Sequence, residues 1–476
     1  MRGLSGRIFW ISPFVFLPGG CMVGPDYQRP QVVSPTAWAE PTANGAPTTH
    51  PSSAATRPAD LARWWRSFND PMLDSLVDRA IATNLDLRQA PARVRQARAA
   101  RGVVASAFWP GADVSGSYTR SGGANRRQTL TDSSADLYRA GLDATWELDI
   151  FGGVRRDIEA AQADIQSAIE DRRDVLVTLV AEVGLDYTDL RGIQRQIEIA
   201  NNNLAAQRRS AELTRQRNAI GFVSRLDVVN AEALVASTAS QIPMLESAER
   251  QTIYALSVLL GMEPGALLEE MSRHAPIPAA PPVVPIGLPS DLLRRRPDIR
   301  RADAQLHAAT ARIGVATADL FPKFSLTGSI GLQGNKPASL FNWANRFWSV
   351  GPSVSWPLFD AGRIRSNIEV QNVLQEQALL SYRSTVLLAW QDVENALIAH
   401  AKEQEHRTAL AAAVAANRQA VDLATQLYRQ GQTDFLNVLS AQRSLYASED
   451  ALVQSDRTVA TNLIALYKAL GGGWEQ

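Results

Sequence analysis

The sequence has almost no cysteine, little histidine and no phosphate-binding loop, and each absence excludes a class of protein. Cys21 is the single cysteine among 476 residues, so an internal disulfide is impossible. The five histidines include no pair at the i, i+4 spacing of a zinc-binding helix. No GxxxxGK[ST] sequence occurs. We therefore expect no metal site, no nucleotide-driven activity and no enzyme.

A surplus of either charge is also missing. Lysine plus arginine and aspartate plus glutamate both number 48, which gives a formal net charge of zero. This balance argues against a general nucleic-acid binder, because such proteins need a strongly basic surface. No apolar run approaches the ~20 residues that a membrane-spanning helix requires.

Residues that break helices are missing from two long segments. Proline is absent from Val154 to Ala219, and both proline and glycine are absent from Arg363 to Gln430. About 66 helical residues at ~1.5 Å each form a rod of roughly 100 Å. In the first segment, apolar residues follow a coiled-coil spacing: Val175, Leu179, Val183 and Leu190.

The N-terminus has the pattern of a secretory signal peptide over residues 1–20. Arg2 and Arg7 precede the apolar stretch Ile8–Leu17, and small residues follow before Cys21. Cys21 stands where a bacterial lipoprotein is lipidated, and Met22 after it is typical of sorting to the outer membrane. The alternative is an incidental cysteine, and Pro18 occupies a position where lipoprotein sites usually have leucine.

The chain repeats itself at an offset of 210 residues. "GFVSRLDVVNAEAL" from Gly221 aligns with "GQTDFLNVLSAQRS" from Gly431, and Trp146 aligns with Trp356. Upstream the offset becomes 212, where Pro110 aligns with Pro322. Such an internal duplication predicts two copies of one structural unit.

Each copy is predicted to read helix, strand, strand, helix. Strict alternation of apolar and polar residues predicts strands at about 111–121 and 137–150, and at about 323–333 and 347–358. Before the first strand, residues 73–108 have helical composition, with a kink or early break expected at Pro91. Pro352 lies within the last strand and predicts a bulge or irregular pairing there.

After each strand pair, a long helical hairpin is predicted, over 152–261 with its tip near 221 and over 362–471 with its tip near 431. Gly221 and Gly431 stand where each helix should reverse, and Ser224 and Asp434 are suitable N-caps for the returning helices.

Four strands cannot close a barrel, for which about eight are the practical minimum. Three chains would supply twelve strands, an even number that permits closure in a membrane, and would arrange the helical rods as a tube. The fold class predicted is therefore mostly α with a transmembrane β-barrel. The alternative is a soluble sandwich of two hairpins whose apolar faces meet.

Several motifs in fixed order resemble the outer membrane efflux lipoproteins of the NodT type, relatives of OprM and more distantly of TolC. They are "CMVGPDYQRP" from Cys21, "WWRSFNDPMLDSLVDRAIATNLDL" from Trp64, "LDIFGGVRR" from Leu148, "RRRPDIRRADAQL" from Arg294, "PLFDAGR" from Pro357 and "LYKALGGGW" from Leu466. The resemblance implies a homotrimeric duct with a twelve-stranded barrel, a periplasmic α-barrel and an equatorial belt.

The same resemblance implies the domain organisation. After the signal peptide, residues 21–71 would form the lipidated N-terminal segment and part of the belt, and 72–261 the first repeat. Residues 262–289 would form a proline-rich equatorial link, 290–471 the second repeat, and 472–476 a short tail.

The resemblance also implies that the hairpin tips gate the duct and dock an adaptor. Asp227 and Tyr428 match a carboxylate and a tyrosine that link neighbouring hairpins; the alternatives are a helix-start charge for Asp227 and ordinary packing for Tyr428. Relatives often have aspartates in the second tip, where this chain has Asn437 and Ser440. Either Asp227 supplies the acidic ring, or Leu436 and Phe435 form an apolar constriction. The expected docking residues are Gly221, Ser224, Leu226, Gly431 and Thr433.

The function expected is a passive exit duct for small molecules such as drugs, opened by a periplasmic adaptor protein and driven by an inner-membrane pump of the RND type. Outer membrane lipid is the other expected partner, and no cofactor is expected beyond a covalent acyl lipid, such as palmitate, on Cys21. Two alternatives stay open: an exit duct for type I protein secretion, and a lipid-anchored periplasmic coiled-coil scaffold without a pore.

Overall fold

The computed structural model describes residues 22–39, 61–123, 133–279 and 289–475. Cys21 and the predicted signal peptide lie outside these ranges. The chain divides into two compact units. One comprises residues up to 28, 98–164 and 306–378 and holds the strands, and the other comprises 29–97, 165–305 and 379–476 and is helical. Each unit is considered by itself below.

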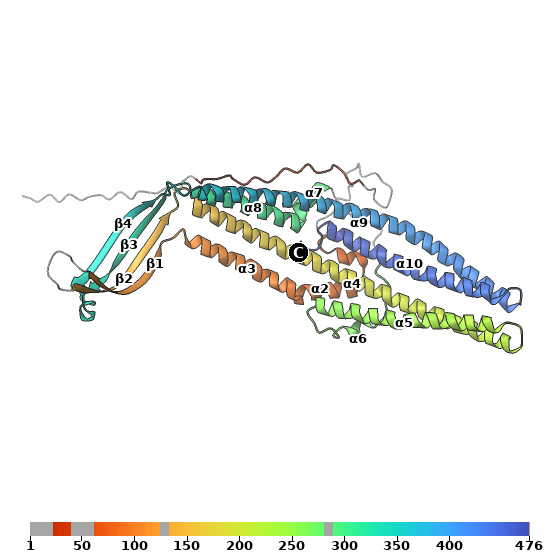
Figure 1. Ribbon diagram of the computed structural model, residues 1–476. Coiled ribbons are helices and arrows are strands. Elements are labelled where there is room, and N and C mark those ends of the chain that lie inside the picture. The colour runs from red at the N-terminus through yellow and green to blue at the C-terminus, as the bar shows by residue number, and fades with distance from the viewer. Residues whose placement is uncertain (1–21, 40–60, 124–132, 280–288, 476) are drawn as a thin grey trace, which may run out of the picture. The chain divides into compact units, whose positions relative to one another are not determined.

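The helices of the described residues fall into two matching series (Figure 1). The longest are α4 (Gly153–Ala219) and α9 (Arg363–Arg429), each of 67 residues, followed by α5 (Arg225–Leu259) and α10 (Phe435–Ala469), each of 35. The others are η1 (Trp64–Phe68), α2 (Pro71–Thr83), α3 (Leu85–Ser106), α6 (Leu268–Met271), α7 (Pro289–Arg295), α8 (Pro297–Ala318), η2 (Pro337–Ser339) and η3 (Trp343–Asn345). The two long proline-free segments thus form the long helices that their composition predicts.

The helix predicted at 73–108 breaks at Asn84 rather than at Pro91. The Asn84 side chain accepts a hydrogen bond from the Leu87 backbone N–H at 2.9 Å, and so caps α3. The same side chain donates to the Leu259 carbonyl oxygen at 2.9 Å. Pro91 lies inside the first two turns of α3, which continues through it. A local cap and a contact with a distant helix end therefore act together at the break.

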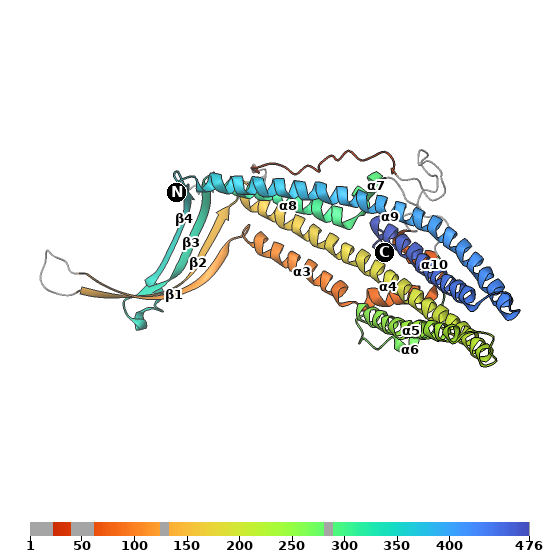
Figure 2. The same cartoon turned by 45° about the vertical axis from the view of Figure 1, so that its right-hand side comes forward.

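The four strands form one antiparallel sheet in the order β1-β2-β3-β4 (Figure 2). They are β1 (Gly111–Gly123), β2 (Ser133–Leu148), β3 (Lys323–Gly334) and β4 (Arg346–Ser355). The second strand of each pair ends before the predicted limit. After β2 the Asp149 carboxylate accepts from the Val154 and Arg155 backbone N–H groups, so Asp149 belongs to the start of α4.

The bulge predicted at Pro352 is wrong. The β3–β4 register continues without interruption through the pair Leu326–Pro352, from Lys323–Ser355 to Leu332–Arg346. In this chain β4 is an edge strand of the sheet, where proline is tolerated because the missing N–H need not serve the ladder.

One face of the sheet is apolar and exposed. In all three strand pairings, even-numbered residues lie opposite even-numbered residues, so the even-numbered positions of the four strands share one face. Most of the apolar strand residues have even numbers and therefore lie on this face. Large side chains on it have the following exposed fractions: Val114 84%, Leu142 51%, Ile330 56%, Trp348 73% and Val350 67%. The opposite face is lined mainly by serine, threonine and glycine. An apolar face of this size needs a partner.

The helical unit has a core in which aromatic residues of η1 pack against both repeats. Trp64 and Trp65 are 1% exposed, and the Trp64 ring stacks on Tyr467 of α10 at 5.2 Å between centroids. The Tyr187 hydroxyl of α4 donates to the Asp70 carboxylate at 2.7 Å. Burial is the main cause that raises the pKa of Tyr187 to about 12.

A search of the described residues finds no helix that is both long and apolar enough to cross a membrane.

Candidate functional site: the hairpin tips

Both hairpins reverse at the same end of the helical unit (Figures 1 and 2). The two turns have the same pattern of backbone hydrogen bonds. In the first, the Phe222 N–H donates to the Arg217 carbonyl oxygen at 2.9 Å; in the second, the Gln432 N–H donates to that of Leu427 at 2.9 Å. Gly221 has φ +80° and Gly431 has φ +73°, in the left-handed region that closes such a helix end. Glycine is favoured at both positions because a side chain strains this conformation.

The returning helices begin at the predicted N-caps. The Ser224 hydroxyl accepts from the Asp227 backbone N–H at 3.2 Å, and the Asp227 carboxylate accepts from the Ser224 backbone N–H at 2.9 Å. This reciprocal pair is a capping box. In the second tip, the Asp434 carboxylate accepts from the Asn437 backbone N–H at 3.2 Å, and the Asn437 amide donates to the Thr433 hydroxyl at 2.8 Å.

An aromatic cluster fixes the two tips against each other. Tyr428, 2% exposed, packs against Phe435, also 2% exposed, with ring centroids 5.5 Å apart. Residues from α4, α5 and α10 complete the cluster: Ala211, Ala231, Leu234, Val438 and Leu439. The Tyr428 hydroxyl donates to the Thr214 hydroxyl of α4 at 3.4 Å.

Arg217 of the first hairpin caps the long helix of the second. Its guanidinium donates to the Tyr428 carbonyl oxygen and lies over the Tyr428 ring, 4.6 Å from the centroid. A cation at a helix C-terminus satisfies a terminal carbonyl and interacts favourably with the helix dipole. Arg217 thereby couples the two tips within one chain.

Asp227 and Tyr428 have different partners in this chain. Asp227 belongs to the capping box, whereas Tyr428 lies inside the cluster with Thr214 and Arg217. A link between Asp227 and the Tyr428 of a neighbouring copy stays a prediction.

Of the two residues proposed as an apolar constriction, Leu436 is 61% exposed, whereas Phe435 is buried within the tip. Asn437 and Ser440 are exposed, as are four of the expected docking residues: Gly221, Ser224, Leu226 and Gly431. Leu226 is 67% exposed and Thr433 is partly buried.

The sequence interpretation missed Arg217, Thr214 and an asymmetry between the tips. The first tip exposes Ile220 at 69% and Phe222 at 73%, and the matching residues of the second tip are Gln430 and Gln432. The repeat contained this signal, because Arg217 aligns with Leu427, an exchange that marks a contact made by one copy alone.

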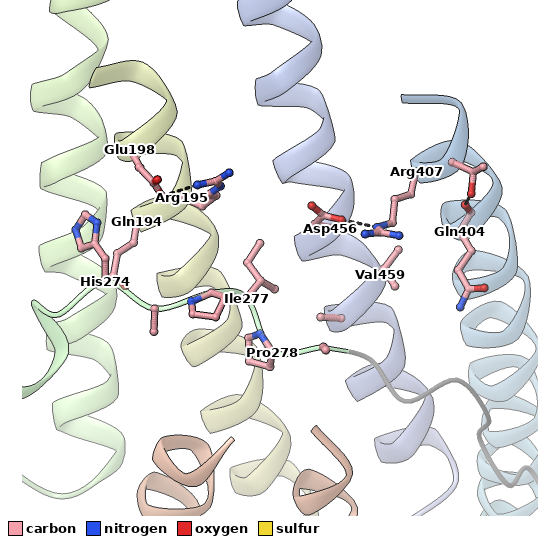
Figure 3. A pocket seen from close by; sticks show the side chains of 15 residues that line it. Gln194, Arg195, Glu198, His274, Ile277, Pro278, Gln404, Arg407, Asp456 and Val459 are labelled. Carbon is pink, nitrogen blue, oxygen red and sulfur yellow. Dashed lines mark hydrogen bonds and ion pairs between the residues drawn. The ribbon is translucent and has the colours of Figure 1, made fainter. Parts of the chain in front are cut away.

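A cavity of about 840 Å³ lies between the two hairpins (Figure 3). Gln194 and Arg195 of α4 line one side, and Arg407 of α9 and Asp456 of α10 line the other, with residues 274–279 crossing between them. Its charges are neutralised locally, since Arg195 pairs with Glu198 at 2.6 Å and Arg407 pairs with Asp456. The described residues contain no group of three or more His, Cys, Asp or Glu that could hold a metal ion.

Comparison with protein families gives one match. The family model described as "Outer membrane efflux protein" matches residues 76–262 and 288–472, one segment for each repeat.

Similar proteins cover nearly the whole chain. Nodulation protein T of Rhizobium leguminosarum bv. trifolii is 35% identical over 467 residues, which cover 97% of this chain and 96% of that protein. The pyoverdine export outer membrane protein OpmQ of Pseudomonas aeruginosa is 35% identical over 438 residues, 88% of each chain.

The fold of this chain is also similar to solved structures of outer membrane channels. The outer-membrane channel OprN has a TM-score of 0.88 and 38% identity, covering 96% of this chain and 100% of that one. The open state of the Neisseria gonorrhoeae MtrE outer membrane channel has a TM-score of 0.80 and 29% identity, covering 95% and 99%.

Proposed function

The chain belongs to the outer membrane efflux protein family, and from this premise we propose that it is the exit duct of a tripartite efflux system. Three copies form the duct, with twelve strands closed in the outer membrane of a Gram-negative bacterium and the long helices extending into the periplasm. The duct is passive and has no catalytic role. Similarity to named channels over nearly the whole chain supports this assignment.

The observation that carries the proposal is the sheet itself. A single chain leaves the outer edges of β1 and β4 unpaired and a broad apolar face exposed. Inside a bilayer both strand edges must be hydrogen-bonded, since lipid cannot replace the missing partners. Closure by three copies pairs every edge and turns the apolar face to lipid and the polar face to the lumen.

The tips are the proposed site for opening and docking. A periplasmic adaptor would contact Gly221, Ser224, Leu226, Gly431 and Thr433, and the apolar first tip supplies contact area in Ile220 and Phe222. The inner-membrane pump would be of the RND type. Relatives are named for pyoverdine and toluene, which supports export of small molecules.

Lipidation of Cys21 is proposed to anchor the N-terminus in the same membrane. Met22 and Val23, which follow it, lie against the turn between β2 and α4, where the Val23 N–H donates to the Phe151 carbonyl oxygen at 3.1 Å. Arg156 of α4, only 3% exposed at its side chain, donates to Asp26 at 2.6 Å and to the Val23 carbonyl oxygen at 3.2 Å. These contacts hold the segment after Cys21 beside the end of the sheet, and they support an anchor there, because a lipid on Cys21 would reach the bilayer.

The test of the duct is conductance. Protein purified in detergent should migrate as a trimer that resists mild heating and should open ion-conducting pores in a planar bilayer. A monomer that stays in the aqueous fraction and conducts no ions would support the scaffold instead.

Docking has its own test. Gly431→Trp places a bulky side chain at a positive-φ turn residue, so export should be lost while the trimer and its membrane insertion remain. Normal export by this variant contradicts the docking role of the tips.

A further inference from the structure

Phe347 is the aromatic side chain on the polar face of the sheet among the described strand residues. Its neighbours on β4 with the same parity are Ser349, Gly351 and Ser353. If the chain is the duct proposed above, on which this inference rests, this face lines the lumen. A large ring among small polar residues therefore has a position that substrates pass.

The Phe347 ring packs over the backbone of two glycines. Phe347 is directly opposite Gly331, and Gly331 is directly opposite Gly141. A Cβ at Gly331 would lie 2.9 Å from the Phe347 ring and 2.4 Å from the Ala140 carbonyl oxygen, and one at Gly141 would lie 3.4 Å from the ring. Because neither glycine has a side chain, the ring can lie flat across β4, β3 and β2 in close contact with their backbone.

Arg139 of β2 covers this ring. Its guanidinium carbon lies 4.0 Å from the Phe347 centroid, while the side chain as a whole is exposed. The stacked guanidinium is therefore oriented and still accessible from the polar face. A planar cation held in this way presents paired N–H donors, the geometry that carboxylates and sulfonates accept.

The other charges of this face lie away from the stack. Asp143, the next charged residue on the same face of β2, is four residues away, roughly 13 Å along a strand, which exceeds the ~10 Å screening length in 0.1 M salt. Asp143 also accepts from Ser115 at 2.5 Å. Asp113 is directly opposite Asp143, and Glu147 and Lys323 lie still farther from Arg139, with Lys323 paired to Asp319 at 2.9 Å. Arg120 and Asp136 pair with each other on the other face.

We propose that Arg139 and Phe347 form a contact site for aromatic anions in the lumen, near the end of β3 and β4 that is remote from α8 and α9, with one copy per chain. The anionic group binds the guanidinium, and the aromatic part of the ligand stacks on the guanidinium plane and the Phe347 edge. An aromatic ring over a strand glycine can stabilise a sheet by itself, but that role needs no cation over the ring. The guanidinium of Arg139 is therefore the feature that points to a ligand.

The experiment measures the concentration of naphthalene-1-sulfonate that halves the current through a single pore. Methanesulfonate, an aliphatic anion with the same charged group, is measured for comparison. In the wild type the aromatic anion should block at a lower concentration than methanesulfonate. Arg139→Gln and Phe347→Leu should each raise the half-blocking concentration of the aromatic anion about three- to tenfold, with Phe347→Leu leaving methanesulfonate unchanged. Arg139→Lys, which keeps the charge without the plane, should fall between.

Arg346→Gln is the matched control, since Arg346 faces Leu332 and lies on the opposite face at the same end of the sheet. It removes an equal charge and should leave the block unaltered. Pores whose block is the same in the wild type, Arg139→Gln and Phe347→Leu would overturn the site and leave the duct intact. A wild type that opens no pore overturns the proposed function and this site together.

Discussion

Trp146 and Trp356 occupy matching positions in the two repeats and make the same contact. Their indole N–H groups donate to the carbonyl oxygens of Phe108 and Leu320, each at 3.0 Å. Single residues that fix the backbone are thus shared by the repeats. Arg217, which couples one repeat to the other, occurs in the first copy only.

Arg217→Leu introduces the residue that the second repeat has at the matching position. It removes a charged hydrogen bond to the Tyr428 carbonyl and the stacking on its ring, so opening of the tips should become easier by about 1–3 kcal/mol. Hydrogen exchange should show faster exchange of the amides around both turns. Arg215→Leu is the control, because Arg215 lies on nearly the opposite side of α4 and makes only exposed ion pairs, with Glu212 and Glu232. This variant should change the exchange rates little. Equal effects of the two variants would contradict the role of Arg217.

Asp186 of α4 gives a prediction for pH. Burial, followed by repulsion from Asp189 and Glu182, raises the pKa of Asp186 from 3.8 to about 6. The folded state holds the proton of Asp186 more tightly than the unfolded state does. The stability that protonated Asp186 contributes is therefore fully present below about pH 3.8 and is lost as the pH rises through about 6. Asp186→Asn should therefore raise the melting temperature at pH 8, and the gain should disappear near pH 4.

Melting curves across this range check the prediction, with Asp422→Asn at an exposed position of α9 as control. A gain from Asp186→Asn that does not change with pH would show that the carboxylate charge is not its cause.

At the scale of elements, four helices end in the same glycine turn. The glycines after α4, α5, α9 and α10 have positive φ: Gly221, Gly261, Gly431 and Gly471. The environment of these turns differs. A Cβ at Gly221 would meet nothing within 4 Å, whereas one at Gly261 would lie 2.7 Å from the Thr83 carbonyl oxygen.

This difference predicts a graded effect of alanine. Gly221→Ala should cost about 1 kcal/mol through backbone strain alone, and Gly261→Ala should cost more because backbone must also move. Thermal or denaturant unfolding of the two variants measures the difference. A Gly221→Ala variant as unstable as Gly261→Ala would show that strain at the turn, rather than contact with α2, dominates.

At the scale of the whole molecule, the composition of the tips bears on ion selectivity. A ring of carboxylates at a constriction favours cations. The second tip presents Asn437 and Ser440 instead, so we predict weaker cation selectivity than in relatives with acidic tips. Reversal potentials in a salt gradient measure this preference, and strong cation selectivity that persists in Asp227→Asn would contradict the prediction.

Local features of this fold could be predicted from the sequence because they depend on residues a few positions apart. Alternation along each strand, glycine at each helix end, and Ser224 and Asp434 as N-caps all act through neighbouring backbone groups. The family resemblance pointed to Tyr428, yet its burial against Phe435 and its contact with Arg217 depend on two hairpins meeting.

The sequence by itself determined the repeat, the strands and the helical hairpins, since periodicity and turn residues encode local hydrogen bonding. Tertiary structure alone decided the contact of Asn84 with the Leu259 carbonyl, the position of Phe347 over Gly141 and Gly331, and the separate partners of Asp227 and Tyr428. Each of these depends on which distant side chain or carbonyl lies within contact distance, and chain-local patterns contain no such distance.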